Sequence, residues 1–279
     1  MKIFKSVSAI LLLAILITGC GKDNEAQKRL DEAKAMYENK DYIAAKSAID
    51  SINILFPREI EVRKGALTLM RLVERGECTQ NISYCDSVIP IRVGELDGLK
   101  KGFVFEKDSV YDEIGNYIWN TMTIERNVER SYIRCGVNEE GEMYMASVYF
   151  GSRPIDHTGL KLSVNDGAFA VTPAIPYDGG VNYRFKDFGN TTEVVTYKGE
   201  HCKTTANFVT VMDSKERIKA EYTGGKAYSL YLSDNDKKAI KATYELASAL
   251  SEIIAMQKEK TKSERKIMMI DEKLKNSNE

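Results

Sequence analysis

The segment SYIRCGVNEEGEMYMASVYFG, residues 131–151, contains two runs rich in aromatic and β-branched residues, separated by a polar stretch with a glycine. Runs of this kind, bounded by Gly, Asp and Asn, are typical of short strands joined by tight turns. We find no helix-length pattern between such runs in residues 87–232, so we expect an antiparallel, jelly-roll-like β-sandwich there. The expected strands are 89–96, 102–108, 116–124, 131–137, 143–151, 160–166, 168–173, 181–187, 192–199, 207–213, 217–223 and 228–233.

The region before the sandwich has a helical pattern. Apolar residues recur there at steps of three and four, as in Leu30, Ala33 and Tyr37. We expect a helical hairpin followed by a third helix, which together make a helical unit at residues 26–86. The fold class is therefore α+β.

Three positions in the hairpin carry a resemblance to a known repeat. Ala33, Ala45 and Pro57, with Tyr42 between them, resemble one tetratricopeptide-type helical hairpin, in which small residues let two helices approach. The pattern occurs once, whereas a binding solenoid needs about three repeats. We therefore expect a plain helical hairpin and carry no peptide binding over.

A long C-terminal helix is expected at residues 233–275, with a short tail at 276–279. Ser233 and Asp236 form an approximate capping box, and neither Pro nor Gly follows before the tail. The helix is expected to pack back on the helical unit through its first half. The expected contacts are those of Ile240, Tyr244, Ala247 and Ile254 with Leu30, Tyr37, Ile49 and Leu67.

The second half of this helix is strongly charged from residue 258 onward. Its only apolar stripe is Ile267, Ile270 and Leu274. If it is exposed, this stripe is a seam for self-association or for another envelope protein. The alternative is a frayed amphipathic tail without a partner.

The first 19 residues have the layout of a secretory signal peptide, with two lysines, a short apolar run and small residues. The apolar run is about half the ~20 residues that a membrane-spanning helix needs. The sequence ITGC at residues 17–20 resembles the bacterial lipobox. The resemblance implies acylation of Cys20 and cleavage before it, which leaves residues 20–25 as a lipidated tether. The alternative is a plain secretory signal.

The charged residues after Cys20, GKDNE at 21–25, resemble the export signal of some surface lipoproteins of the Bacteroidota. That resemblance implies display at the cell surface, whereas a solvated leader before the first helix explains the same charges. We expect a lipoprotein of the outer membrane, in the cell envelope, that faces either the periplasm or the surface and is held by its lipid.

The charge balance is close to neutral. The whole chain has 40 basic and 41 acidic residues, and removal of residues 1–19 takes away two lysines and no acids. The remaining 38 basic and 41 acidic residues give a net charge of −3. A nucleic-acid partner would require a clustered basic face, and none is expected.

Four cysteines remain beyond Cys20: Cys78, Cys85, Cys135 and Cys202. An even number in an exported chain is typical of disulfides. Cys78 and Cys85 share a short segment that we expect to be a polar loop, which favours a local bridge. Cys135 and Cys202 lie in strand-like segments and are expected to pair across a sheet. Zinc binding beside His201 is an alternative, although no CxxC or HxxxH spacing is present.

Aromatic residues are the candidates for ligand binding. Tyr117 and Trp119 lie on the same side of an expected strand, and Tyr177 and Tyr183 lie in a tyrosine-rich segment. Exposed aromatic rings on a β face bind sugars by stacking. The alternative is that Trp119, the only tryptophan, anchors the core of the sandwich.

No catalytic residue, metal ligand or cofactor is predicted. The two histidines, His157 and His201, are expected in polar loops, and Asp156 cannot pair with His157 because adjacent residues of an extended chain point apart. No nucleophile-elbow, zinc-protease or phosphate-loop motif is present.

Two serines match a modification pattern. The sequences DSV at 86–88 and 108–110 resemble the acceptor pattern for O-glycosylation in Bacteroides-type bacteria, which implies glycans on Ser87 and Ser109. A third match, at Ser51, lies in an expected helix.

These features predict a lipid-anchored envelope lipoprotein with a non-catalytic role in binding or scaffolding. A binding module would recognise a glycan or a protein through exposed aromatic residues of the sandwich. A scaffold would use the C-terminal helix. A hydrolytic enzyme is the third alternative, and it would need a cleft that brings together polar groups remote in sequence.

Overall fold

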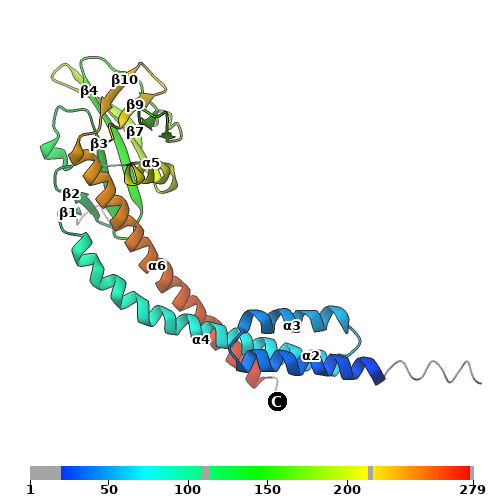
Figure 1. The fold of residues 1–279 in the computed structure, drawn as a ribbon. Coiled ribbons are helices and arrows are strands. Elements are labelled where there is room, and N and C mark those ends of the chain that lie inside the picture. The colour runs from blue at the N-terminus through cyan, green and yellow to red at the C-terminus, as the bar shows by residue number, and fades with distance from the viewer. Residues whose placement is uncertain (1–19, 108–112, 213–215, 277–279) are drawn as a thin grey trace, which may run out of the picture. The chain divides into compact units, whose positions relative to one another are not determined.

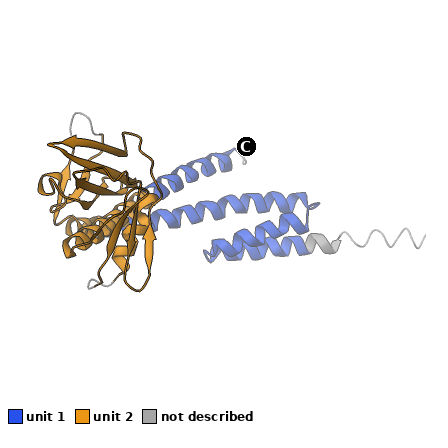
Figure 2. Cartoon of the chain, turned by 90° about the horizontal axis from the view of Figure 1, so that it is seen from above, with its two compact units in different colours: residues 1–88, 257–279 blue, residues 89–256 orange. Residues whose placement is uncertain are grey.

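The computed structural model describes residues 20–107, 113–212 and 216–276, with side chains from residue 25 onward. The chain has an α+β fold, with helices, two antiparallel sheets and a long C-terminal helix, as the sequence predicts (Figure 1). It divides into two compact units, residues 1–88 with 257–279 and residues 89–256 (Figure 2). Helices α4 (Ile60–Leu99) and α6 (Asp234–Lys275) each contribute residues to both units.

The first unit contains the predicted helical hairpin, α2 (Cys20–Glu38) and α3 (Tyr42–Leu55). The Asp41 carboxylate caps α3 by accepting a hydrogen bond from the Ala44 backbone N–H. Ala33 and Ala45 are fully buried, which lets the two helices approach closely. The core of this unit consists of Ala26, Leu30, Ala33, Ala45, Ile49, Ile52, Phe56, Ala66, Leu69 and Val73.

The last part of α6 belongs to this first unit. Three ion pairs link it to α4: Lys260 with Asp86, Lys266 with Glu74, and Arg75 with Asp271, which lie 2.5, 3.2 and 2.7 Å apart. The apolar stripe considered as a partner seam is largely covered in this unit. Ile270 is buried, and Ile267 and Leu274 are half-buried. The condition for a partner seam, an exposed stripe, is therefore not met.

The first part of α6 packs in the second unit. Ile240, Leu246, Ala247 and Ile253 belong to the core that also contains the sheets. The predicted contacts of Ile240 and Ala247 with Leu30, Tyr37, Ile49 and Leu67 are wrong, since Leu30 and Ile49 lie in the separate core of the first unit and Leu67 is exposed. The helix does return to the helical unit, but with its second half.

Helix α4 corrects the prediction of a strand at residues 89–96. The helix continues through this segment to Leu99, with Pro90 inside it. Ile89, Leu96 and Leu99 follow one another at helical steps and pack on the core of the second unit. A short apolar run does not distinguish a strand from a buried helix, and here the helical spacing decided the outcome.

Of the twelve predicted strands, those at 89–96 and 207–213 are not strands, and the other ten are present. A six-stranded sheet has the order β1-β2-β3-β4-β8-β7, and a four-stranded sheet has the order β10-β9-β5-β6, with every pair antiparallel. The strands are β1 (Phe103–Glu106), β2 (Asn116–Trp119), β3 (Tyr132–Asn138), β4 (Met143–Gly151), β5 (Gly159–Ser163), β6 (Phe169–Val171), β7 (Asn182–Asp187), β8 (Asn190–Lys198), β9 (Lys219–Thr223) and β10 (Tyr228–Tyr231).

The prediction of a strand at residues 207–213 is also wrong. Residues 207–211 form the end of helix α5 (Glu200–Val211). Cys202, Thr205, Ala206, Phe208 and Val209 are the buried residues of this helix, and they recur at helical spacing. A helix therefore does interrupt the strands, contrary to expectation. Among the described residues, no helix combines the length and apolar character needed to cross a membrane.

The two sides of the six-stranded sheet differ. On one side, here called the core face, Met145 accepts a weak hydrogen bond from Thr205 of α5, and Cys135 contacts Thr243 of α6. On the other side, here called the open face, Tyr132, Val148, Val194 and Tyr183 are paired across four neighbouring strands. The contacts of α5 and α6 named here are made with the core face.

Candidate functional site

The open face carries a groove of about 300 Å³ at one end of the sheet. Its floor is the cross-strand row Tyr132, Val148, Val194 and Tyr183. Tyr132 and Val148 are only 4% and 9% exposed, and residues of the segment before β3 line the same groove. A concave apolar surface with a few polar groups is the usual form of a ligand site.

Large apolar side chains stand exposed on both sides of this groove. Ile124 and Val128 belong to the segment before β3, and Phe185 and Phe188 belong to the β7–β8 hairpin. Phe188 is 94% exposed, and each of the other three is more than half exposed. Contiguous exposed apolar groups rimmed by polar ones mark interaction surfaces in soluble domains.

Phe188 also occupies an unfavourable backbone position. Asp187 pairs with Asn190, so Phe188 and Gly189 form a two-residue hairpin loop with φ angles of 45° and 83°. Such loops favour Asn before Gly, and a bulky residue at positive φ is uncommon. The sequence thus places a strained, almost fully exposed aromatic residue at the groove, and neither packing nor backbone preference accounts for it.

A second groove, of about 280 Å³, adjoins the first along the same face. The two grooves share Arg134, Tyr144 and Thr196 in their linings. The rest of the second groove is mainly polar and is lined by Glu106, Asn116, Asn138, Glu142, Met143 and Lys198. Because β4 runs under both, the open face is an elongated surface with an aromatic half and a polar half.

Arg134 lies where the two halves meet. Its Nη2 donates to Glu106 Oε2 at 3.0 Å, whereas its buried Nε has no hydrogen-bond partner among the described residues. Burial raises the pKa of Tyr132 and of Tyr144, so both hydroxyls stay protonated and uncharged at neutral pH. The junction therefore holds a guanidinium that is paired with Glu106 through Nη2 and lies beside two uncharged tyrosine hydroxyls.

Of the four predicted ligand-binding aromatics, only Tyr183 lies in this groove. Tyr117 and Trp119 point to the core face of β2 and pack half-buried against the core, where Lys100 and Lys238 lie over their rings. The prediction of an exposed platform at these two residues is wrong, and the alternative of a core role for Trp119 is the observed one. Tyr177 is exposed and stacks against Arg184 outside the groove.

No disulfide joins the four described cysteines, all of which are buried. Cys78 and Cys85 lie on one continuous helix, seven residues and therefore about 10 Å apart, which is too far for a bridge. Cys202 lies in α5 instead of a strand, which removes the reason for expecting it to pair with Cys135. Burial raises the pKa of Cys135 and of Cys202 to about 12.

The remaining predicted sites are the two glycosylation serines, the signal peptide and Cys20. Ser87 is exposed on α4, where its hydroxyl donates to the Tyr84 carbonyl, so it is as helical as Ser51. Ser109, the signal peptide at 1–19 and the side chain of Cys20 lie outside the described residues. The described residues contain no group of three or more His, Cys, Asp or Glu side chains that would suit a metal.

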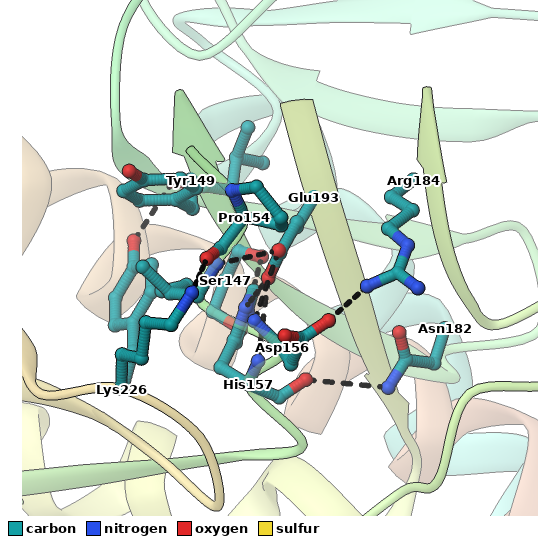
Figure 3. Close-up of polar contacts among 12 residues, drawn as sticks. Ser147, Tyr149, Pro154, Asp156, His157, Asn182, Arg184, Glu193 and Lys226 are labelled. Carbon is teal, nitrogen blue, oxygen red and sulfur yellow. Dashed lines mark hydrogen bonds and ion pairs between the residues drawn. The ribbon is translucent and has the colours of Figure 1, made fainter. Parts of the chain in front are cut away.

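A buried polar network on the core face joins β4, the loop at residues 153–157 and β8 (Figure 3). Glu193 accepts hydrogen bonds from the backbone N–H groups of Ile155, Asp156 and His157 and lies 2.9 Å from His157 Nδ1. His157 Nε2 lies 2.9 Å from Ser147 Oγ. His157 thus lies in a loop, as predicted, but is buried and paired, whereas His201 is exposed and lies in helix α5 instead of a loop.

The order Ser147–His157–Glu193 resembles the hydrogen-bond chain of a serine hydrolase, but no substrate can reach it. Ser147 is fully buried, His157 and Glu193 are at most 3% exposed, and the Ser147 hydroxyl also contacts Tyr197. The network instead fastens the loop at residues 153–157 to β8. Asp156 adds an ion pair with Arg184 outside this core (Figure 3).

Sequence reasoning missed the groove because its residues come from several elements. One signal was available. The β4 sequence MYMASVYFG is apolar on both faces, whereas a sheet with one solvated face usually alternates apolar and polar residues. Phe188 before Gly189 is a second signal, because it stands where a hairpin favours Asn.

The comparisons with known proteins add no family assignment. No family model matches the chain, and no curated protein and no solved structure is significantly similar to it. The site must therefore be interpreted from its own geometry.

Proposed function

We propose that this chain is a lipid-anchored lipoprotein of the bacterial outer membrane whose sheet-containing unit binds a ligand without catalysis. The observation that carries the binding role is the groove on the open face, with a buried Tyr132 floor and four exposed apolar side chains around it. The lipobox-like residues at 17–20 support the anchor at Cys20 and the location in the cell envelope.

Two observations favour binding over the alternatives. The stripe at Ile267, Ile270 and Leu274 is largely covered within its own unit, which leaves a scaffold without the seam it was expected to use. The Ser147–His157–Glu193 network has no access for substrate, so it offers a hydrolase no usable nucleophile. The groove volume lies at the small end of the usual range for ligand sites.

A glycan is one candidate ligand. The polar half of the open face presents Asn116, Asn138 and Thr196, which suit sugar hydroxyls, beside the tyrosines of the aromatic half. A protein is another candidate ligand, and it would contact the exposed phenylalanines of the β7–β8 hairpin.

The binding role is tested with the fluorescent probe 1-anilinonaphthalene-8-sulfonate. The full-length chain carrying Cys20→Ala should bind the probe saturably, and combining Phe185→Ala with Phe188→Ala should weaken binding by about tenfold. The matched control is Phe169→Ala, since Phe169 is 60% exposed on β6 and does not line the groove. Equal binding by the double variant and the control would refute a ligand site at this groove.

The anchor is tested separately. Cys20→Ala should move the protein from the membrane fraction to the soluble fraction, because the lipid supplies the attachment. Retention of this variant in membranes after a high-salt wash would contradict lipid anchoring at Cys20.

A further inference from the structure

The chemistry of the open face identifies a class of ligand, on the basis of the binding role proposed above. Its aromatic half is built for a flexible apolar group. The floor row is apolar apart from the tyrosine hydroxyls, and the exposed side chains of Ile124, Val128, Phe185 and Phe188 line the same groove. Burial of apolar surface there would be non-directional, which suits a chain better than a rigid polar ring.

The polar half adjoins this apolar surface and begins at Arg134. A buried donor without a partner is costly in a native fold, and Arg134 Nε is such a donor among the described residues. A guanidinium group binds carboxylate and phosphate oxygens with strong, charge-assisted hydrogen bonds. An oxygen anion at the exposed part of this guanidinium would be held by charge and by such hydrogen bonds.

The other charges of the polar half are compatible with such a head group. Glu106 is already paired with Arg134 through Nη2, and the Arg134 side chain is still 19% exposed. Lys198 is exposed at the far end of the same groove and has no ion pair among the described residues. Glu142 is the remaining acid in the lining, and it leaves room for a head group that also carries a positive charge.

We propose that the ligand is a single-chain amphiphile, with its hydrocarbon chain in the aromatic half of the open face and an anionic oxygen head at Arg134. The length of the face suits an extended molecule. The seven residue steps from Met143 to Phe150 of β4 span about 23 Å, and both grooves lie along this strand.

Two probes with the same tail and opposite heads test the proposal. Dodecanoate and dodecyltrimethylammonium are titrated calorimetrically, below their micellar concentrations, into the full-length chain carrying Cys20→Ala. Dodecanoate should bind about tenfold or more tightly than dodecyltrimethylammonium. Equal binding of the two would overturn the anionic head, and binding of neither would overturn the amphiphile.

Variants locate the head group. Arg134→Gln should weaken dodecanoate binding by about tenfold and leave dodecyltrimethylammonium binding unchanged or stronger. Arg134→Lys keeps the charge near Glu106 but removes the Nε donor, so it should also weaken dodecanoate binding. The control is Arg184→Gln, because Arg184 lines neither groove and pairs with Asp156. Circular dichroism and the unfolding midpoint identify any variant that does not fold, and Arg134→Lys then serves as the informative one.

The outcomes separate this proposal from the binding role itself. If maltohexaose binds and dodecanoate does not, the amphiphile is wrong and the groove is a glycan site. If 1-anilinonaphthalene-8-sulfonate binding is also insensitive to the loss of Phe185 and Phe188, the groove is not a ligand site at all, and both proposals fail.

Discussion

The two faces of the six-stranded sheet are built from the same strands but have opposite chemistry. The core face holds polar groups deep in the protein, including Ser147 and Glu193, and each of these has hydrogen-bond partners. The open face presents Tyr183, Phe185 and Phe188 to solvent. A fold that needed the open face only for solubility would place its polar side chains there instead.

The comparison shows how each face is stabilised. Burial of Glu193 is tolerated because three backbone N–H groups and the His157 ring satisfy it. Exposure of Phe188 at positive φ is unfavourable in itself, and no contact in its own unit compensates for it in the way the hydrogen bonds compensate Glu193. The core face therefore carries the stability, and the open face carries features that stability does not require.

The largest effect is expected at Glu193 on the core face. Glu193→Ala should lower the free energy of unfolding by about 3–5 kcal/mol, because it strands three buried N–H groups and the His157 ring. Urea denaturation measures the loss, and Glu221→Ala, at a partly exposed surface ion pair, is the control. A loss below about 1 kcal/mol would mean that the network does not fasten the loop at residues 153–157.

The next effect separates the faces by packing. Ile240→Ala should cost about 2–4 kcal/mol, since Ile240 of α6 is fully buried against the core face. Ile124→Ala beside the groove should change stability by less than about 0.5 kcal/mol, because Ile124 is 55% exposed. Similar losses at the two positions would show that the open face is packed as a core.

A smaller effect is expected at alkaline pH. Burial raises the pKa of Cys135 and of Cys202 from the ordinary thiol value of about 9 to about 12. The stability they contribute is complete below pH 9 and is lost as the pH rises toward 12, because only the unfolded thiols ionise in that window. The free energy of unfolding should fall by about 1–3 kcal/mol between pH 8 and pH 10.

The cysteine variants check the source of this dependence. Combining Cys135→Ala with Cys202→Ala should reduce the loss of stability between pH 8 and pH 10, whatever its effect at pH 8. An unchanged pH dependence in this variant would assign the effect to other groups, such as Tyr197, whose pKa burial also raises to about 12.

The smallest effect has the opposite sign. Phe188→Asn should stabilise the protein by about 0.5–1 kcal/mol, because Asn before Gly suits a two-residue hairpin loop and tolerates positive φ. The same variant should weaken binding of 1-anilinonaphthalene-8-sulfonate. Thermal unfolding and fluorescence titration together measure the two effects. A destabilised variant would mean that Phe188 supports the fold and would remove the contrast between the faces.

The sequence by itself determined the local structure of most of the chain. The β-rich runs at 131–137 and 143–151 became β3 and β4, and the steps of three and four residues at Leu30 and Ala33 became a buried helical stripe. These features are readable because the repeat of a helix or a strand is a property of neighbouring residues. The same information also predicted the α+β fold class.

Only the tertiary structure decided whether the ambiguous segments form a helix or a strand. Residues 89–96 and 207–211 are apolar and short, and each is helical, with Leu96 and Phe208 in the core at helical spacing. The sequence cannot express this choice locally, since the partner surface comes from residues far away in the chain.

The tertiary structure alone also decided the site. Period-two alternation states which residues share a face of a strand, but it does not state which face a helix will cover. Helices α5 and α6 contact the core face and leave Tyr183 and Phe185 open, whereas Tyr222 of β9 stacks on the ring of His157, which is buried with Glu193, 36 residues away. Coverage depends on long-range packing, whereas the pattern is local, and for this reason the groove emerges only when the chain is folded.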